Sequence, residues 1–301
     1  MLEQAFLDFG YTKKEYETIR NTYPIVNLKD ETLLNSFRNI TKFLSDMGYS
    51  KPDIIRMTND LPQLFGYSED NIKQKIDDIV SLGYKREEVI SMTKRVPAIF
   101  SLGIETIIQK KNDLISLGFS ENNIIKMSKR APSLFNYGID NIKRKMDDLM
   151  VLGFAKENII KMITTSPAIF SYSIETIKQK IDDIMALGYT KEDVIGMMIS
   201  LPSLMGASIE GIREKVNFYD SINMHDLPIV NPKNLMQSTK LSYARYIFLT
   251  ERGQKIDMTS YGDLFIGNKK FEKQYGITKE KLIEKYNYER YLEERKNERT
   301  I

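Results

Sequence analysis

Lysines recur along this sequence at a spacing that suits a row of phosphate contacts. One position is lysine in five successive copies of a repeated phrase, at Lys75, Lys110, Lys145, Lys180 and Lys215. Each lies 35 residues after the one before it. The backbone of a nucleic acid is a regular array of negative charge, and Lys and Arg side chains neutralise it. The spacing therefore predicts a periodic cationic surface that follows a nucleic acid.

Other bases accompany this position. Two copies end their first segment with a Lys-Arg pair, and the C-terminal residues 233–273 hold eight bases against four acids. The candidate nucleic-acid-binding residues are Lys75, Lys94, Arg95, Lys110, Lys129, Arg130, Lys143, Arg144, Lys145, Lys180, Lys215, Lys240, Arg245 and Arg252. If one groove joins the central and C-terminal groups, both contact the same ligand.

A solvated helix face is the alternative interpretation of the same charges. Several bases lie four residues before an acid, as in Lys73–Asp77, Lys143–Asp147 and Lys178–Asp182. Such pairs stabilise a helix by only about 0.2–0.5 kcal/mol, and a base placed before the acid is the weaker order. Because stability alone favours the reverse order, we prefer the ligand-binding interpretation.

The elements that must position these bases are repeats. Glycine recurs at Gly48, Gly83, Gly118, Gly153 and Gly188, and proline at Pro62, Pro97, Pro132, Pro167 and Pro202. Both series step by 35 residues, and a looser earlier copy carries Gly10 and Pro24. A fixed period in this range indicates stacked supersecondary units rather than one enclosed core.

Each repeat has the signals of a helical hairpin. After the glycine, Ser50 and Asp53 form a predicted capping box, and Thr12 with Glu15 and Thr190 with Asp193 repeat it. The proline should end this first helix and start a short turn element. A second helix follows, capped by Ser173 in one copy, with an apolar stripe of helical period. The recurring methionines Met57, Met92, Met127, Met162 and Met197 are expected in the core.

These signals predict an all-α fold. We expect a right-handed α-solenoid of about six hairpins over residues 1–220, a C-terminal helical closing segment over 221–290 and a charged tail over 291–301. We expect a monomer.

Composition argues against catalysis. The chain of 301 residues has no cysteine and one histidine, His225, which we expect on the surface or in a linker. It carries no Walker loop, Rossmann fingerprint or HExxH motif. We therefore expect neither enzymatic activity nor a cofactor or metal. The net charge is only +3, and the excess lies in residues 221–301, with 15 Lys/Arg against 11 Asp/Glu.

No leader or membrane segment is evident in the sequence. The N-terminal stretch lacks a basic flank followed by an apolar core, and no apolar run reaches the roughly 18–20 residues that a membrane span needs. The expected location is cytoplasmic, or an organelle matrix if a leader has been removed from a mature form.

The chain resembles the mitochondrial transcription termination factor (mTERF) family. The resemblance rests on the recurring proline, the phrase "SIETIKQKIDDIMALGYTKEDVI" and the closing stretch "LMQSTKLSYARYIFLTERGQKIDMTSYGDLFIGNKKFEKQYGI", and it spans about Phe9 to Tyr286. It implies a curved helical solenoid whose basic concave face follows double-stranded DNA in transcription, or structured or ribosomal RNA. It would place the basic side chains of the hairpins and the closing segment on phosphates.

The functional hypothesis is therefore a nucleic-acid-binding protein, with double-stranded DNA favoured and a role in transcription termination or regulation. Structured RNA and a protein-protein scaffold stay open as alternatives. The salt dependence of nucleic-acid affinity separates binding to phosphates from a scaffold role.

Overall fold

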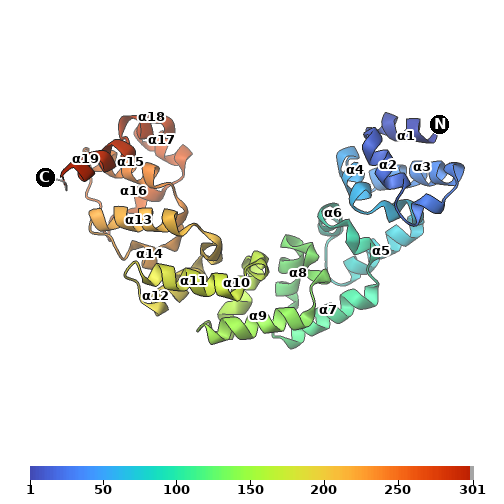
Figure 1. Ribbon diagram of the computed structural model, residues 1–301, viewed down its shortest axis with the longest axis horizontal. Helices are drawn as coiled ribbons and strands as arrows, with labels where there is room; N and C mark the ends of the chain where they lie inside the picture. Colours follow the sequence, from blue (N-terminus) through green and yellow to red (C-terminus); the bar gives the residue numbers. More distant parts are fainter. Residues whose placement is uncertain (299–301) are drawn as a thin grey trace. The chain divides into compact units, whose positions relative to one another are not determined.

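The chain is built from helices joined by short loops (Figure 1). In the computed structural model, residues 1–298 are described, and none of them lies in a β-strand. The predicted all-α class is confirmed.

The repeating element is a first helix, a short 3-10 helix and a second helix. The first helices are α2 (Lys13–Arg20), α4 (Lys51–Asp60), α6 (Arg86–Arg95), α8 (Glu121–Arg130), α10 (Lys156–Thr165), α12 (Lys191–Ser200) and α14 (Leu227–Val230). The 3-10 helices are η1 (Ile25–Asn27), η2 (Pro62–Gly66), η3 (Pro97–Ser101), η4 (Pro132–Asn136), η5 (Pro167–Ser171), η6 (Pro202–Gly206) and η7 (Pro232–Met236).

Second helices follow each 3-10 helix, and further short helices occupy the two ends of the chain. The second helices are α3 (Asp30–Asp46), α5 (Glu69–Ser81), α7 (Ile104–Ser116), α9 (Ile139–Val151), α11 (Ile174–Met185), α13 (Ile209–Ser221) and α15 (Thr239–Thr250). The others are α1 (Leu2–Phe9), α16 (Gly262–Phe265), α17 (Asn268–Tyr275), α18 (Lys279–Lys285) and α19 (Tyr288–Glu298).

Local chemistry sets where each helix begins and ends. Ser50 accepts the amide of Asp53 while the Asp53 carboxylate accepts the amide of Ser50, so the predicted capping box is present. The same box forms at Thr12 and Thr190, and the Ser173 hydroxyl caps α11. At the other end, Leu61 has φ −137° and ψ 76°, outside the α region that a residue before proline avoids. The helix therefore stops at the proline, as predicted.

The closing segment begins with a shortened seventh copy of the repeat. Helix α14 has 4 residues, and η7 and α15 follow it in the usual order. Its proline, Pro232, comes 30 residues after Pro202 rather than 35, so the fixed period does not reveal it. The division of the chain at residue 220 stays a prediction, but hairpin architecture continues past it.

The chain forms two compact units, which we treat separately. Unit 1 comprises Met1–Asp147 and Ile163–Ala168, and unit 2 comprises Asp148–Met162 and Ile169–Ile301. Within unit 1, helices α2, α4, α6 and α8 pack in succession, as do α3, α5 and α7 (Figure 1). We call these two sets the first-helix layer and the second-helix layer. In unit 2, α11, α13 and α15 follow one another in the same way.

The apolar stripes of the helices are buried in the core. The recurring methionines are each at most 1% exposed, which confirms their predicted core position. A separate apolar cluster around Ala244, Phe248 and Leu264 stabilises the closing segment. No helix of the described part of the chain is both long and apolar enough to cross a bilayer.

Buried tyrosines connect neighbouring first helices through one hydrogen bond each. The hydroxyls of Tyr11, Tyr49 and Tyr84 lie 2.6, 2.6 and 2.7 Å from those of Thr58, Thr93 and Ser128, which come 47, 44 and 44 residues further on. Burial raises the pKa of Tyr49 to about 12. In the copies that carry Phe119 and Phe154, the residues 44 positions later are the apolar Ile163 and Met198. Polar residues are thus matched with polar ones at these junctions.

This matching predicts a specific pattern of stability. Thr93→Val leaves the buried Tyr49 hydroxyl without its partner, which should lower the free energy of unfolding by about 1–3 kcal/mol. The double variant Tyr49→Phe with Thr93→Val should recover most of that loss, because no polar group is then left unpaired. Urea denaturation measures both. A double variant no more stable than Thr93→Val alone would contradict the matched-pair account.

Candidate nucleic-acid interface

The recurring lysines of the second helices bond to the next hairpin. Lys180 Nζ donates to the carbonyl oxygen of Ala207 at 2.6 Å, and Lys75 and Lys110 donate to the carbonyls of Leu102 and Tyr137. Each acceptor lies 27 residues further on and is the C-cap residue of the next 3-10 helix. Such end carbonyls lack an intrahelical partner, so the ammonium group satisfies them. Lys145, at the same position of α9, is also engaged.

Lys215 and Arg245 extend this row into the closing segment, but buried. Lys215 is 0% exposed and its Nζ lies 2.9 Å from Ser242 Oγ; burial lowers its pKa to about 7. Arg245 is 1% exposed and donates to the carbonyls of Leu264 and Ile266 at 2.9 and 2.7 Å. The surface position expected for these two residues is therefore wrong. The physical reason is that both fill the junction between stacked helices.

Arg245 belongs to the same series as the lysines. Lys75, Lys110, Lys145, Lys180 and Lys215 each come 13 residues after a proline, and Arg245 comes 13 residues after Pro232. Its guanidinium carbon lies 4.3 Å from the centre of the Phe271 ring, and burial lowers its pKa to about 10. A count from each proline would have found this relation in the sequence.

The bases that end the first helices also bond between repeats. Lys94 Nζ lies 2.9 Å from a carboxylate oxygen of Asp53, and Lys129 pairs with Glu88 one hairpin later. Arg95 donates to the carbonyls of Lys129 and Arg130, and Arg130 donates to that of Thr164 at 2.9 Å. These four residues hold neighbouring first helices together, so a contact with phosphate would compete with packing.

Arg56 performs the same task and was missed by the sequence analysis. Its guanidinium donates to the carbonyl of Lys94 at 2.9 Å and lies 3.4 Å from Asp53. Arg56 lies within α4, whereas Arg95 and Arg130 end their helices. A comparison of matching positions between repeats therefore does not point to Arg56.

Six of the candidate residues are exposed, including Arg95 and Arg130, which bond between repeats. The other four lie outside the first helices. Lys143 and Arg144 lie on α9, and Arg144 donates to the side-chain oxygen of Asn141 at 2.9 Å. Lys240 pairs with Glu289, and the Arg252 guanidinium lies 3.7 Å from the centre of the Phe248 ring. Their contact with a nucleic acid stays a prediction.

His225, expected on the surface or in a linker, is a half-buried packing residue of unit 2. Its ring stacks on Tyr189 at 4.6 Å between centroids, and Nδ1 lies 2.6 Å from a carboxylate oxygen of Asp220. Its backbone carbonyl also accepts the Tyr189 hydroxyl at 2.8 Å.

Charge separates by helix layer in unit 1. The first-helix layer (α2, α4, α6 and α8) holds eleven Lys/Arg against seven Asp/Glu, whereas the second-helix layer (α3, α5 and α7) holds six against nine. Bases such as Lys14, Lys85 and Lys126 are exposed on or beside the first-helix layer. An anionic ligand is therefore attracted to the first-helix layer, whereas the sequence analysis placed the cationic row mainly on second helices.

Unit 2 has its own basic surface. Helix α17 carries the exposed Lys269, Lys270 and Lys273 against a single acid, Glu272. Exposed cations of this kind can contact phosphate without breaking packing.

The chain matches the model of a known protein family. The mTERF family model matches residues 4–151 and 141–229. No individual curated protein matches the chain significantly.

The buried Lys215 predicts an alkaline gain in stability. Its pKa is lowered to about 7 in the folded chain, from 10.5 for an ordinary lysine. Between these values the unfolded chain binds more protons, so stability rises with pH, by at most about 1.4 kcal/mol per pH unit. Below pH 7 this contribution is flat. Melting temperatures should rise from pH 7 to 9 in the wild type and rise less in Lys215→Met. An equal rise with pH in both proteins would contradict a buried Lys215 with a lowered pKa.

The two arginines of the closing segment should behave differently. Arg245→Ala leaves buried carbonyls without a donor and should lower the free energy of unfolding by more than about 3 kcal/mol. Arg252→Ala, its exposed control, should cost less than about 1 kcal/mol. Thermal melts of both variants measure this. Equal losses would show that Arg245 is not the junction residue described above.

Proposed function

Because the chain belongs to the mTERF family, we propose that it binds double-stranded DNA and acts in transcription, in termination or regulation. Family membership itself suggests nucleic-acid binding and a transcription-related role, for a family of helical-repeat proteins rather than enzymes. Double-stranded DNA as the ligand, and termination or regulation as the role, go beyond what family membership suggests.

The observation that carries the proposal is the charge separation in unit 1. Its first-helix layer has an excess of four positive charges, and it retains exposed bases that the stacking of the hairpins does not use. A nucleic-acid backbone binds such a surface mainly through its phosphates, whatever its sequence. Lys269, Lys270 and Lys273 offer a second set of contacts on unit 2.

Structured RNA is the alternative ligand, because its phosphates would contact the same bases. A protein scaffold is the other alternative, since stacked helical hairpins serve widely in that role. Parallel titrations with a DNA duplex and an RNA hairpin of equal length distinguish DNA binding from RNA binding.

The proposal predicts a steep salt dependence. Each phosphate that is neutralised contributes about −0.9 to the slope of log affinity against log salt for duplex DNA. Several contacts should therefore weaken binding by orders of magnitude between about 50 and 200 mM salt. Fluorescence anisotropy with labelled duplexes measures the slope. An affinity that does not change with salt, or no affinity for either nucleic acid, favours the scaffold.

Matched charge reversals test which helix layer binds. Lys85→Glu with Lys126→Glu changes two exposed bases at the first-helix layer, and should weaken DNA binding at least tenfold with little change in melting temperature. The control, Lys73→Glu with Lys143→Glu, makes the same change in charge on second helices and should have a smaller effect. The opposite ranking would place the ligand on the second helices.

A further inference from the structure

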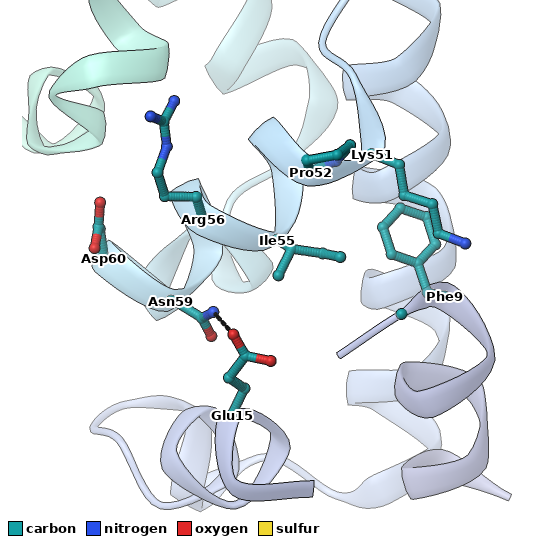
Figure 2. A pocket seen from close by; sticks show the side chains of 9 residues that line it. Phe9, Glu15, Lys51, Pro52, Ile55, Arg56, Asn59 and Asp60 are labelled. Atoms are coloured by element: carbon teal, nitrogen blue, oxygen red, sulfur yellow. Dashed lines mark hydrogen bonds between the residues drawn. The ribbon is translucent and has the colours of Figure 1, made fainter. Parts of the chain in front are cut away.

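A cavity opens in unit 1 between the first hairpin and the helix that follows it. Its volume is about 560 Å³, and its walls come from the end of α1, from α2 and from α4. Figure 2 shows Phe9 and Lys51 on one side and Asp60 on the other, with Ile55 between them and with Glu15 hydrogen-bonded to Asn59. The cavity thus combines an apolar surface with two carboxylates.

The next two grooves along the first-helix layer contain a lysine of the chain itself. Between α4 and α6, Lys94 Nζ lies 2.9 Å from Asp53 and 5.7 Å from the centre of the Tyr49 ring. Between α6 and α8, Lys129 pairs with Glu88. In both grooves the acid is the third residue of its helix, and the ammonium comes from the next repeat.

The first groove has the acid but not the lysine. Glu15 occupies the position of Asp53 and Glu88, and Asn59 occupies that of Lys94 and Lys129. Asn59 Nδ2 donates to Glu15 Oε1 at 2.7 Å, but an asparagine is shorter than a lysine and carries no charge. Hydrogen bonds from Thr12 lower the pKa of Glu15, so its carboxylate is charged at neutral pH. The substitution leaves space and a negative charge together.

The bases around this cavity are already engaged. Arg56 donates to the carbonyl of Lys94 and lies 3.4 Å from Asp53, and Lys51 Nζ lies 4.9 Å from the centre of the Phe9 ring. Among the described side chains, no ion pair within 4.0 Å involves Glu15 or Asp60. Their charge is therefore available to a cation from outside the chain.

We propose that this cavity binds a primary alkylammonium group. The ammonium pairs with Glu15 as Lys129 pairs with Glu88, and the alkyl chain lies against Ile55 and Phe9. The ligand is either a free polyamine or the lysine side chain of another protein, which present the same chemistry. This site is separate from the proposed phosphate contacts and does not depend on them.

The test uses the full chain without nucleic acid. Spermidine and the capped tripeptide acetyl-Ala-Lys-Ala-amide are titrated separately, and NMR chemical shifts follow the wild type and Asn59→Lys. We expect saturable binding to the wild type. Asn59→Lys should weaken it at least tenfold and raise the melting temperature, because its own ammonium then fills the groove. Asn59→Gln, which adds no charge, is the control and should keep the binding.

Each outcome decides the proposal. Binding of spermidine alone identifies a polyamine site, and binding of the tripeptide, with or without spermidine, identifies a site open to lysine side chains. Glu15→Gln, which removes the charge at the third residue of α2 with little change in side-chain size, should abolish binding of both ligands. Binding of neither ligand, or binding that persists in Asn59→Lys and Glu15→Gln, overturns the proposal. None of these outcomes depends on whether the chain binds DNA.

Discussion

The stacking of the hairpins depends on one recurring hydrogen bond. In three copies the lysine 13 residues after the proline reaches the end of the following 3-10 helix, as Lys75, Lys110 and Lys180 do. A hairpin of this kind contacts only its neighbours, so each junction must satisfy its own polar groups. The carbonyl at the end of a 3-10 helix is such a group, and a long, flexible cationic side chain reaches it from the adjacent helix.

The same requirement explains how charge is distributed. Because the recurring lysines of the second helices are used between repeats, they contribute little to the free surface. The second-helix layer of unit 1 has more acids than bases. The first helices use some of their bases in the same way, at Lys94 and Arg95, yet retain exposed ones such as Lys126. A near-neutral chain can in this way present one basic and one acidic layer. The cavity beside Glu15 forms where Asn59 replaces the lysine that, at Lys94 and Lys129, bonds to an acid of the preceding repeat.

The sequence predicted the helices well because their signals are local. Capping boxes at Ser50 and Thr190, breaks before each proline and buried methionines all depend on residues within about five positions. The role of the lysines was not predictable in this way, since their acceptors lie 27 residues away in another repeat. An identical residue in five successive copies fits a contact between repeats as well as a periodic ligand. The relation of Arg245 to the recurring lysines was missed because the last repeat is 30 residues long rather than 35.

We propose that the recurring lysines join the hairpins while other bases face the ligand. Lysine acetylation followed by mass spectrometry, with and without a bound DNA duplex, tests it most directly. We predict that Lys110 and Lys180 react slowly in both states, and that Lys85 and Lys126 react fast in the free protein and become protected by DNA. Fast reaction of Lys110 and Lys180 in the free protein, with protection of these two by DNA, would contradict the account.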